Sequence, residues 1–391
     1  MRRPRVNVIG LWWCLALVRA LRVTPAAAPL PSRRAVLGAA GAVVTGASAT
    51  APQPAVAAPA EVRSPRPLAW RIAPGDPPSM QPYTGRAVES CLGQISSVDA
   101  VFLGVKRGDA ADYALAAKLI ASLQKKAGGR TVAVGMDAAP LGSGPSLASG
   151  SWPNEAAGWP AVGGGDPSFL APLLDVQRSS NVELVPLGIA GDAMAKVQRA
   201  GGIRSLSETE RAAYVDDVSA FVKYAALPGF DAYTKRVVER RYARDVAGKA
   251  DAPSFRDYFA SAILQDEAAA TGAAVYLRKH PGALIVCVVD EARAKFGYGA
   301  VGRARRLEVD FDDPATKTFT ATAVLLNPTA NTTLSTTTQL RLALAVDKPA
   351  NAPVADYVFF SESPRVNLIT HMLNPIDGQF KIDLGLSMPT Q

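Results

Sequence analysis

Short apolar runs alternate with segments of helical periodicity along much of the chain. The first run covers residues 98–105 (VDAVFLGV) and has Gly104 near its end, a pattern typical of a buried strand in a parallel sheet. Asp109 then stands where it can cap a helix, and apolar positions recur at helical spacing until Gly128 and Gly129. The pattern predicts a strand followed by a helix.

The same order repeats further along the chain. Further strands are predicted at residues 131–136, 182–189 and 283–289, and further helices at 168–178, from about 192, and at 253–280. Ser207 and Glu210 have capping-box spacing, which predicts a helix from there through Tyr224. The alternation predicts a three-layer α/β domain in which helices flank a mostly parallel sheet.

The chain is expected to have four parts. They are a cleaved leader at 1–57, an extended Pro/Ala-rich lead-in at 58–84, the α/β domain at 85–306, and a C-terminal extension at 307–391 that packs on the domain. Because of its PRP and PGDPP sequences, the lead-in is expected to be extended and not to hold regular structure for long. Alternating Thr and Val at 319–326 and an apolar run at 357–361 predict a β-rich C-terminal appendage with strands at the sheet edge.

Three targeting features follow one another in the leader. MRRPR precedes an apolar run at 6–18, which is shorter than the roughly 20 residues of a membrane-spanning helix and typical of a signal peptide. A basic stretch rich in Ser, Pro and Ala then has transit-peptide composition, and Arg33-Arg34 with the AVA sequence at 55–57 forms a twin-arginine signal. This order predicts a plastid protein of an alga with a secondary plastid, exported to the thylakoid lumen; a secreted bacterial protein is the alternative.

Charge and cysteine content limit the partners and the disulfides that we expect. The formal charge is +8, but seven arginines and no acid precede residue 58, so the rest carries 8 − 7 = +1. A nucleic-acid partner is therefore not expected, and no membrane span is expected in the mature chain. Cys91 and Cys287 remain after the leader, without a C-x-x-C motif. A buried strand cysteine is the favoured interpretation of Cys287, and whether the two pair stays open.

A series of short motifs occurs in a fixed order between about residues 97 and 306. They are VFLG, the loop residue Trp152, SFLAPLL, VELVPLGI, VQRAGGI, SAILQDEAAA and KFGYG. The series resembles the ChaN family of haem-binding proteins, in its plant and algal branch, which is related to the Tiki and TraB group. The resemblance implies an α/β fold with a haem or metal site at the carboxyl ends of adjacent strands.

The residues that the resemblance implies for that site are replaced in this chain. Gly104 matches the family, but Val105 and Arg107 stand where the family has a glutamate and a histidine, and Arg293 replaces the late histidine. An arginine stays protonated and has no lone pair to offer iron or zinc. Neither a bound metal, a Tiki-like metal-dependent hydrolase nor catalytic activity is therefore expected.

Arginine at these positions suits an anionic ligand. By the resemblance, Arg107 and Arg293 stand at the carboxyl edge of the sheet, where they could bind the propionates of haem or a related tetrapyrrole, or a small organic anion. Met136, Phe296 and Tyr298 are expected to form apolar walls. The alternative is that both arginines pair with nearby acids and close the pocket. The candidate acids are Asp109, Asp290 and Glu291.

Further residues match the family without indicating a reaction. Asp266 and Glu267 are neighbours on a predicted helix and point about 100° apart, so an ion pair with an arginine is expected rather than a shared catalytic role. The other matches are Lys295, Gly297 and Arg303. His280 and His371, the two histidines of the sequence, are not expected to be ligands.

The sequence favours a non-catalytic protein of the thylakoid lumen that binds haem or a related tetrapyrrole. The alternative from another class is an accessory factor of a photosynthetic or other lumenal complex.

Overall fold

The computed structural model describes residues 69–74, 78–83, 87–162, 165–199, 202–307, 319–329 and 353–361. The predictions for the leader, for His371 and for most of the C-terminal extension lie outside these residues. Within them, no helix is long and apolar enough to cross a membrane.

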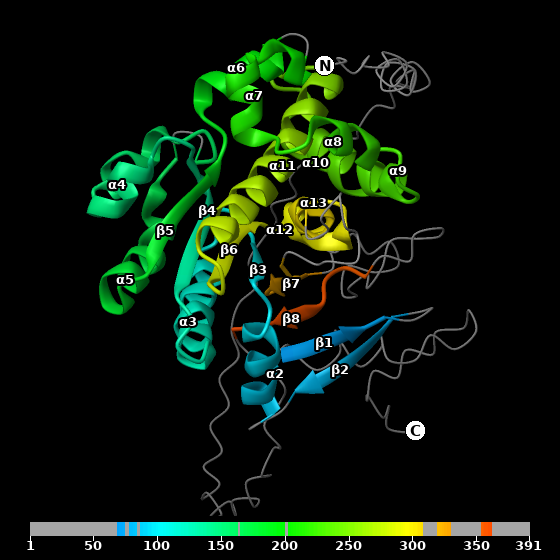
Figure 1. Cartoon of the computed structure of the whole chain (residues 1–391). Coiled ribbons are helices and arrows are strands. Elements are labelled where there is room, and N and C mark those ends of the chain that lie inside the picture. Colours follow the sequence, from blue (N-terminus) through cyan, green and yellow to red (C-terminus); the bar gives the residue numbers. More distant parts are fainter. Residues whose placement is uncertain are drawn as a thin grey trace, which may run out of the picture. The chain divides into compact units, whose positions relative to one another are not determined.

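Eight strands form one sheet (Figure 1). In sheet order they are β2 (Ser79–Tyr83), β1 (Ala69–Ala73), β8 (Tyr357–Phe359), β7 (Ala321–Leu326), β3 (Ala100–Val105), β6 (Leu284–Asp290), β4 (Val132–Pro140) and β5 (Glu183–Gly188). From β8 to β5 every neighbouring pair is parallel, whereas β1 runs antiparallel to both β8 and β2. The predicted mostly parallel sheet is confirmed.

Helices cover both faces of the sheet, because side chains of a strand point alternately to opposite faces. Val101 and Leu103 of β3 pack into the apolar cluster on one face, and Phe102 packs into the cluster on the other. The first face carries α2 (Ala87–Ser96), α3 (Ala110–Lys126), α4 (Gly144–Ser149) and α5 (Ala171–Ser180). The second carries α9 (Phe230–Tyr233), α11 (Phe255–Lys279) and α13 (Ala300–Leu307). The predicted three-layer α/β architecture is therefore present.

The remaining helical elements lie around the end of α11 and in the loops. Three of them, α6 (Gly191–Arg199), α7 (Glu208–Tyr214) and α8 (Val218–Tyr224), share an apolar cluster with α11. A π-helical turn, η6 (Thr234–Glu239), leads into α10 (Arg240–Asp245). The short elements are η2 (Trp152–Asn154), η3 (Ala156–Gly158), η4 (Pro167–Leu170), η5 (Gly202–Ser205), α12 (Glu291–Ala294) and η7 (Lys295–Gly297).

Two predicted helix starts are confirmed, and one predicted helix is interrupted. Asp109 caps α3 by accepting a hydrogen bond from the amide of Ala111, and Ser207 with Glu210 forms the capping box of α7. The helix does not continue through Tyr224, because Val215 is extended and Asp217 caps a new helix, α8.

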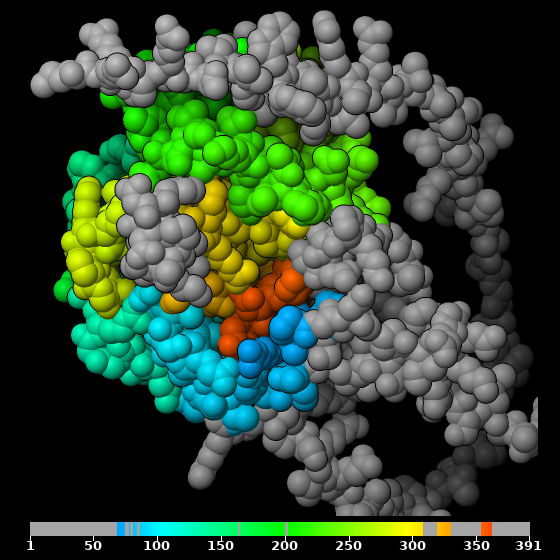
Figure 2. All heavy atoms as spheres, turned by 45° about the vertical axis from the view of Figure 1, so that its right-hand side comes forward, coloured from blue at the N-terminus to red at the C-terminus, as the bar shows by residue number. Residues whose placement is uncertain are grey.

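The predicted place of the C-terminal strands was wrong. They were expected at the sheet edge, but β7 and β8 lie inside the sheet, between β3 and β1. The extended lead-in supplies two short strands, β1 and β2. Figure 2 shows the orange β8 directly beside the blue N-terminal strands. Five of the six residues of β7 are buried, as its place inside the sheet requires.

The two cysteines of the domain do not form a disulfide. Both are buried and free. Cys91 packs into the cluster on one face of the sheet and Cys287 into the cluster on the other. The sheet therefore separates their thiols.

Gly104 lets α12 pack closely against β3. A Cβ at this position would lie 2.6 Å from Cδ2 of Leu325 and 2.8 Å from Cβ of Ala294. A side chain at position 104 would therefore clash with β7 and α12.

Replacing this glycine is expected to destabilise the protein. Gly104→Ala should lower the free energy of unfolding by about 1–3 kcal/mol, because the added methyl group overpacks a closed contact. Gly93→Ala in α2 is the control, since its Cβ would meet no atom within 4 Å. That variant should gain about 0.5–1 kcal/mol. Equal unfolding midpoints in urea for both variants would contradict this assignment.

Candidate functional site

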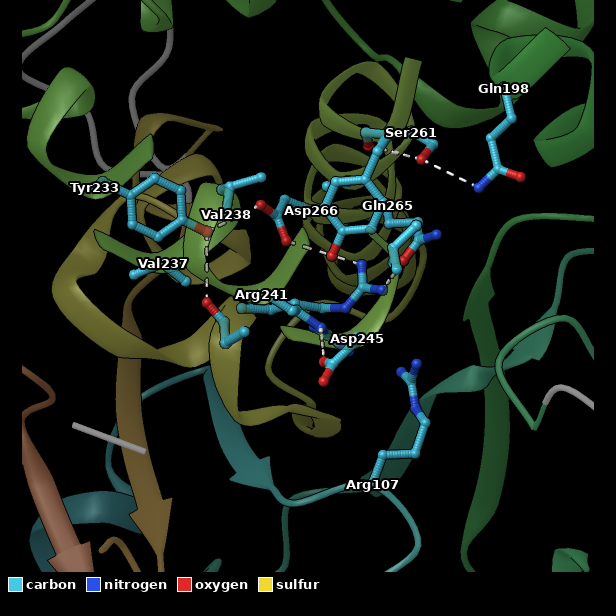
Figure 3. A pocket seen from close by; sticks show the side chains of 15 residues that line it. Arg107, Gln198, Tyr233, Val237, Val238, Arg241, Asp245, Ser261, Gln265 and Asp266 are labelled. Carbon is cyan, nitrogen blue, oxygen red and sulfur yellow. Dashed lines mark hydrogen bonds and ion pairs between the residues drawn. The ribbon is translucent and has the colours of Figure 1, made fainter. Parts of the chain in front are cut away.

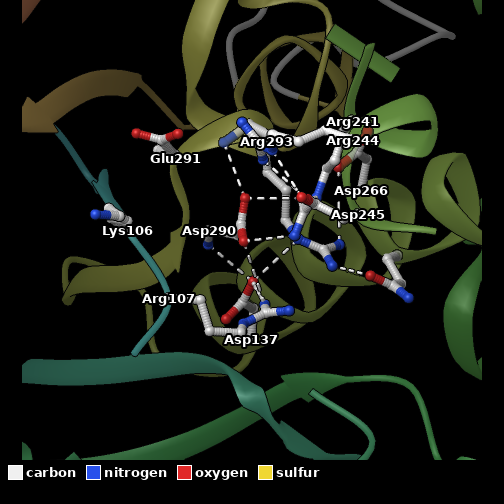
Figure 4. A network of polar contacts seen from close by, with 12 residues as sticks. Lys106, Arg107, Asp137, Arg241, Arg244, Asp245, Asp266, Asp290, Glu291 and Arg293 are labelled. Carbon is white, nitrogen blue, oxygen red and sulfur yellow. Dashed lines mark hydrogen bonds and ion pairs between the residues drawn. The ribbon is translucent and has the colours of Figure 1, made fainter. Parts of the chain in front are cut away.

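Three adjacent parallel strands end at one edge of the sheet, and charged side chains gather there. Arg107 follows β3, Asp137 lies near the end of β4, and Asp290 is the last residue of β6. Arg293 stands on α12, directly after β6. The carboxyl ends of parallel strands are the usual binding crevice of an α/β sheet, and Figure 4 shows this arginine–carboxylate network there.

The carboxylate of Asp137 holds the network together. Its Oδ2 accepts hydrogen bonds from Nη2 of Arg107 at 3.2 Å and from the amide of Asp290 at 2.9 Å. Nε of Arg293 lies 3.0 Å from the same oxygen. The Asp137 side chain is 4 % exposed and the Arg293 side chain 8 %. One buried oxygen therefore joins two guanidinium groups and the end of β6.

A second carboxylate fixes an arginine that comes from a helix. Both side-chain oxygens of Asp290 accept hydrogen bonds from Arg241 at 2.8 Å, in a bidentate pair. Arg107 approaches the same carboxylate at 3.9 Å. Arg241 lies on α10, just after the π-helical turn η6. Such turns are often found at functional sites.

The charges shift one another's protonation. Burial alone would raise the pKa of Asp290, but the guanidinium groups of Arg241, Arg107 and Arg293 hold it well below its usual range. Burial raises the pKa of Asp266 to about 6, although Arg293 opposes the shift. Asp290 therefore stays ionised, whereas Asp266 gains a proton in mildly acidic solution.

Two cavities lie on either side of Gln265 and Arg293. The first, of about 210 Å³, has a wall formed by α10, α11 and η6 and is drawn in Figure 3. The second, of about 290 Å³, lies toward β5 and α6. Arg107, Gln198, Gln265 and Arg293 line both. Taken together they reach the size of small-molecule pockets, roughly 300–1,000 Å³. We call this pair the edge cleft.

One guanidinium donor at the edge cleft has no acceptor. Nε of Arg107 is buried and has no hydrogen-bond partner among the described residues, whereas Nε of Arg293 faces the carboxylate of Asp137 at 3.0 Å. A buried donor without a partner costs free energy, and a bound acceptor would recover it. The cleft can therefore accept an anionic oxygen.

The structure brings together some of the predicted binding residues and separates others. Arg107 and Arg293 lie together and line the edge cleft. Met136 is buried among the apolar residues of the α3 face instead. Phe296 and Tyr298 line a different, more open hollow of about 550 Å³ next to α8 and α13. The predicted apolar walls are thus not walls of the edge cleft.

The paired acids have separate partners, as their helical geometry requires. Asp266 lies 3.8 Å from Arg293 and accepts a hydrogen bond from the hydroxyl of Tyr233. Glu267 pairs with Arg303 at 2.8 Å and with Arg306. The guanidinium of Arg303 is buried and also lies 4.7 Å from the ring centre of Tyr224. The expected ion pair of a helix acid with an arginine is present.

The other candidates have local roles. Asp109 pairs with Lys106 and Glu291 with Lys295, so neither is a partner of Arg107 or Arg293. Gly297 has a φ of +67°, which an L residue rarely adopts. His280 ends α11 and stacks on Tyr276. Among the described residues, no group of three or more His, Cys, Asp and Glu side chains could hold a metal ion.

Several residues of the site were not predicted from the sequence. Asp137 directly follows the predicted second strand, so its position at a strand end was an available signal. Arg241, Gln265 and Tyr258 come from helices and join the site only through tertiary packing. Gln265 lies within the SAILQDEAAA motif, whereas no motif contains Arg241 or Tyr258.

Removing the central carboxylate is expected to cost much more stability than removing an exposed one. Asp137→Ala should lower the free energy of unfolding by about 3–5 kcal/mol, because Arg107 and Arg293 would lose their buried partner. Asp245→Ala is the control, since its side chain is 42 % exposed. It should lose at most about 1 kcal/mol. Similar losses in urea unfolding would show that Asp137 is not central.

The raised pKa of Asp266 predicts a gain of stability in acid. A carboxyl whose pKa is about 6 when folded, and lower when unfolded, binds its proton more tightly in the folded state. Stability should therefore rise as the pH falls from above 6 toward 4, by on the order of 3 kcal/mol. Urea unfolding of the wild type and Asp266→Asn at pH 7.5 and 4.5 tests this. The gain should be absent in Asp266→Asn, and an equal response of both proteins would contradict it.

Comparison with known proteins gives one family and two solved structures. The family model described as haem-binding uptake, Tiki superfamily, ChaN matches residues 91–303. Two solved structures align with this chain at 10 % identity. One, titled "Cofacial heme binding to ChaN of Campylobacter jejuni", has a TM-score of 0.44 and covers 74 % of this chain and 96 % of that one. The other, the type III effector HopBA1, has a TM-score of 0.33 and covers 70 % and 93 %. No curated protein matches. Because the matched residues span more than half of the chain, the protein belongs to the ChaN family of the Tiki superfamily.

Proposed function

We propose that this protein binds haem or a related tetrapyrrole through its propionates at the edge cleft, without catalysing a reaction. The observation that carries the proposal is the guanidinium of Arg107 at the edge cleft, whose Nε has no acceptor among the described residues. Membership of a family described as haem-binding supports the ligand class. The Campylobacter relative is named for binding cofacial haem, which is consistent with this class.

The residues of the edge cleft fit the carboxylate end of such a ligand. Arg107 is the more accessible of the two arginines, with 23 % of its side chain exposed, whereas Arg293 is nearly buried. Guanidinium groups form strong, directional hydrogen bonds with carboxylates. Val237, Val238 and Ala262 provide apolar surface in the same cavity. Arg107 would therefore hold a propionate of the bound ligand, and these apolar residues would contact its carbon atoms.

Tyr258 is the residue of the cleft best suited to ligate iron. Its side chain lines the first cavity, and its hydroxyl makes no hydrogen bond to the residues that the structure describes. The hydroxyl of Tyr233 is engaged by Asp266. Haem iron, when bound, accepts a phenolate oxygen as its axial ligand in some proteins. Tyr258 would then hold the iron while the arginines hold the propionates.

The replaced residues support a binding role rather than hydrolysis. Val105 is fully buried and packs into the α3 face, so the position that the family gives to glutamate offers no acid. Arg107 cannot act as a general base, because its guanidinium stays protonated. Arg107 and Val105 therefore supply neither the acid nor the base of the family positions, while Arg107 can bind an anion.

The leader supports a place in the thylakoid lumen. A signal peptide, a transit-like stretch and a twin-arginine sequence follow one another in residues 1–57. A tetrapyrrole-binding protein there would keep a reactive pigment or haem bound away from the membrane. This location is part of the proposal.

Titration with haemin tests the proposed function. The wild type should show a saturable shift of the Soret band, and Arg107→Gln should weaken the affinity about 10- to 100-fold, because a charge-assisted hydrogen bond is lost. Arg256→Gln, an exposed residue outside the cleft, is the matched control and should leave the affinity unchanged.

Iron-free protoporphyrin separates binding of the propionates by Arg107 from ligation of the iron by Tyr258. It should bind the wild type and lose affinity in Arg107→Gln to the same extent as haemin. Tyr258→Phe should weaken haemin alone. No saturable change with either compound would remove the proposal, and so would equal affinities of the wild type and Arg107→Gln.

A further inference from the structure

A larger cavity lies on the other side of Arg241 from the edge cleft. It measures about 450 Å³. Six cationic side chains line it, namely Lys106, Arg107, Arg240, Arg241, Arg244 and Lys295. Three carboxylates line it as well, from Asp245, Asp290 and Glu291. We call it the basic cavity, because its wall carries 6 − 3 = +3 charges.

Three segments that are distant in the sequence converge on the basic cavity. Lys106 comes from the loop after β3, Arg240 and Arg244 come from α10, and Lys295 follows α12. Arg240 and Arg244 are four residues apart on a helix, so they lie on the same face. The fold therefore places several cations around one hollow, although no motif in the sequence unites them.

The cations of the basic cavity differ in how closely a carboxylate pairs with them. Asp290 holds Arg241 in a bidentate pair, and Asp245 holds Arg244 at 2.6 Å. Arg240 makes no hydrogen bond or ion pair with any residue that the structure describes. Lys106 has one loose contact, at 3.7 Å from Asp109, and is 63 % exposed. Arg240 and Lys106 thus give the rim of the cavity a positive charge that no close carboxylate neutralises.

A nearly buried ammonium group lies deeper in the wall. The Lys295 side chain is only 5 % exposed, and its Nζ is 3.7 Å from Glu291, longer than a direct hydrogen bond. Burial lowers the pKa of Lys295 and raises the pKa of Glu291. Lys295 therefore adds a buried cation to the wall of the basic cavity.

We infer that the basic cavity binds a compact oxyanion of the phosphate class, with at least two negative charges. Arginine forks on α10 match the oxygen geometry of a phosphate group. Only two of the residues that line it, Val237 and Ala292, have apolar side chains, whereas nine carry a charge. This site is additional to the proposed tetrapyrrole site and does not depend on it, although Arg107 borders both.

Calorimetric titration of the purified chain with sodium pyrophosphate, at constant ionic strength set by chloride, tests the inference. One pyrophosphate should bind per chain. The double variant R240Q/R244Q should bind at least 10-fold more weakly, because two charge-assisted contacts are lost. Both arginines are exposed, so the variant should fold as the wild type does. R256Q is the matched control, an exposed arginine that does not line the cavity, and it should bind as the wild type does.

The possible results separate the two sites. Absence of saturable binding to the wild type would overturn the inference. An equal loss in R256Q and R240Q/R244Q would also overturn it, because the attraction would then come from overall charge. Haemin titration of R240Q/R244Q should match the wild type. If pyrophosphate binds as expected but haemin does not, the tetrapyrrole proposal alone fails.

Discussion

The site at the sheet edge depends on the compensation of buried charge around the carboxylate of Asp137. This side chain is almost fully buried, and an isolated carboxylate in such a place would be strongly destabilising. Arg107, Arg293 and the amide of Asp290 surround it. Asp290 in turn holds Arg241, so charges from β3, β4, β6 and α10 stabilise one another. Losing one member would leave the others unpaired within the core, which makes the network a single unit.

The same network determines what the cleft can bind. Each guanidinium has more donors than its carboxylate partners use, and Nε of Arg107 is buried without an acceptor among the described residues. Guanidinium groups at the strand ends offer no lone pair to a metal but supply donors for carboxylates.

The sequence was sufficient for the parts of the fold that rest on local patterns. Apolar runs marked β3, β4, β5 and β6, and Asp109 and Ser207 marked helix starts through their side-chain chemistry. The position of β7 and β8 inside the sheet could not be predicted, because strand order is set by long-range pairing. For the site, the pairing of Arg107 with Asp290 was foreseen as an alternative, whereas Asp137 and Arg241 were missed. Phe296 and Tyr298 were assigned to the wrong hollow, since sequence distance from Arg293 does not tell which way a turn directs its side chains.

A crystal structure of the protein in complex with haemin would test whether the edge cleft binds the propionates. We expect a propionate oxygen within hydrogen-bond distance of Nε of Arg107, with the contact between Arg107 and Asp137 retained. Density for the macrocycle at another place, with the edge cleft empty and unchanged, would contradict the proposed binding site.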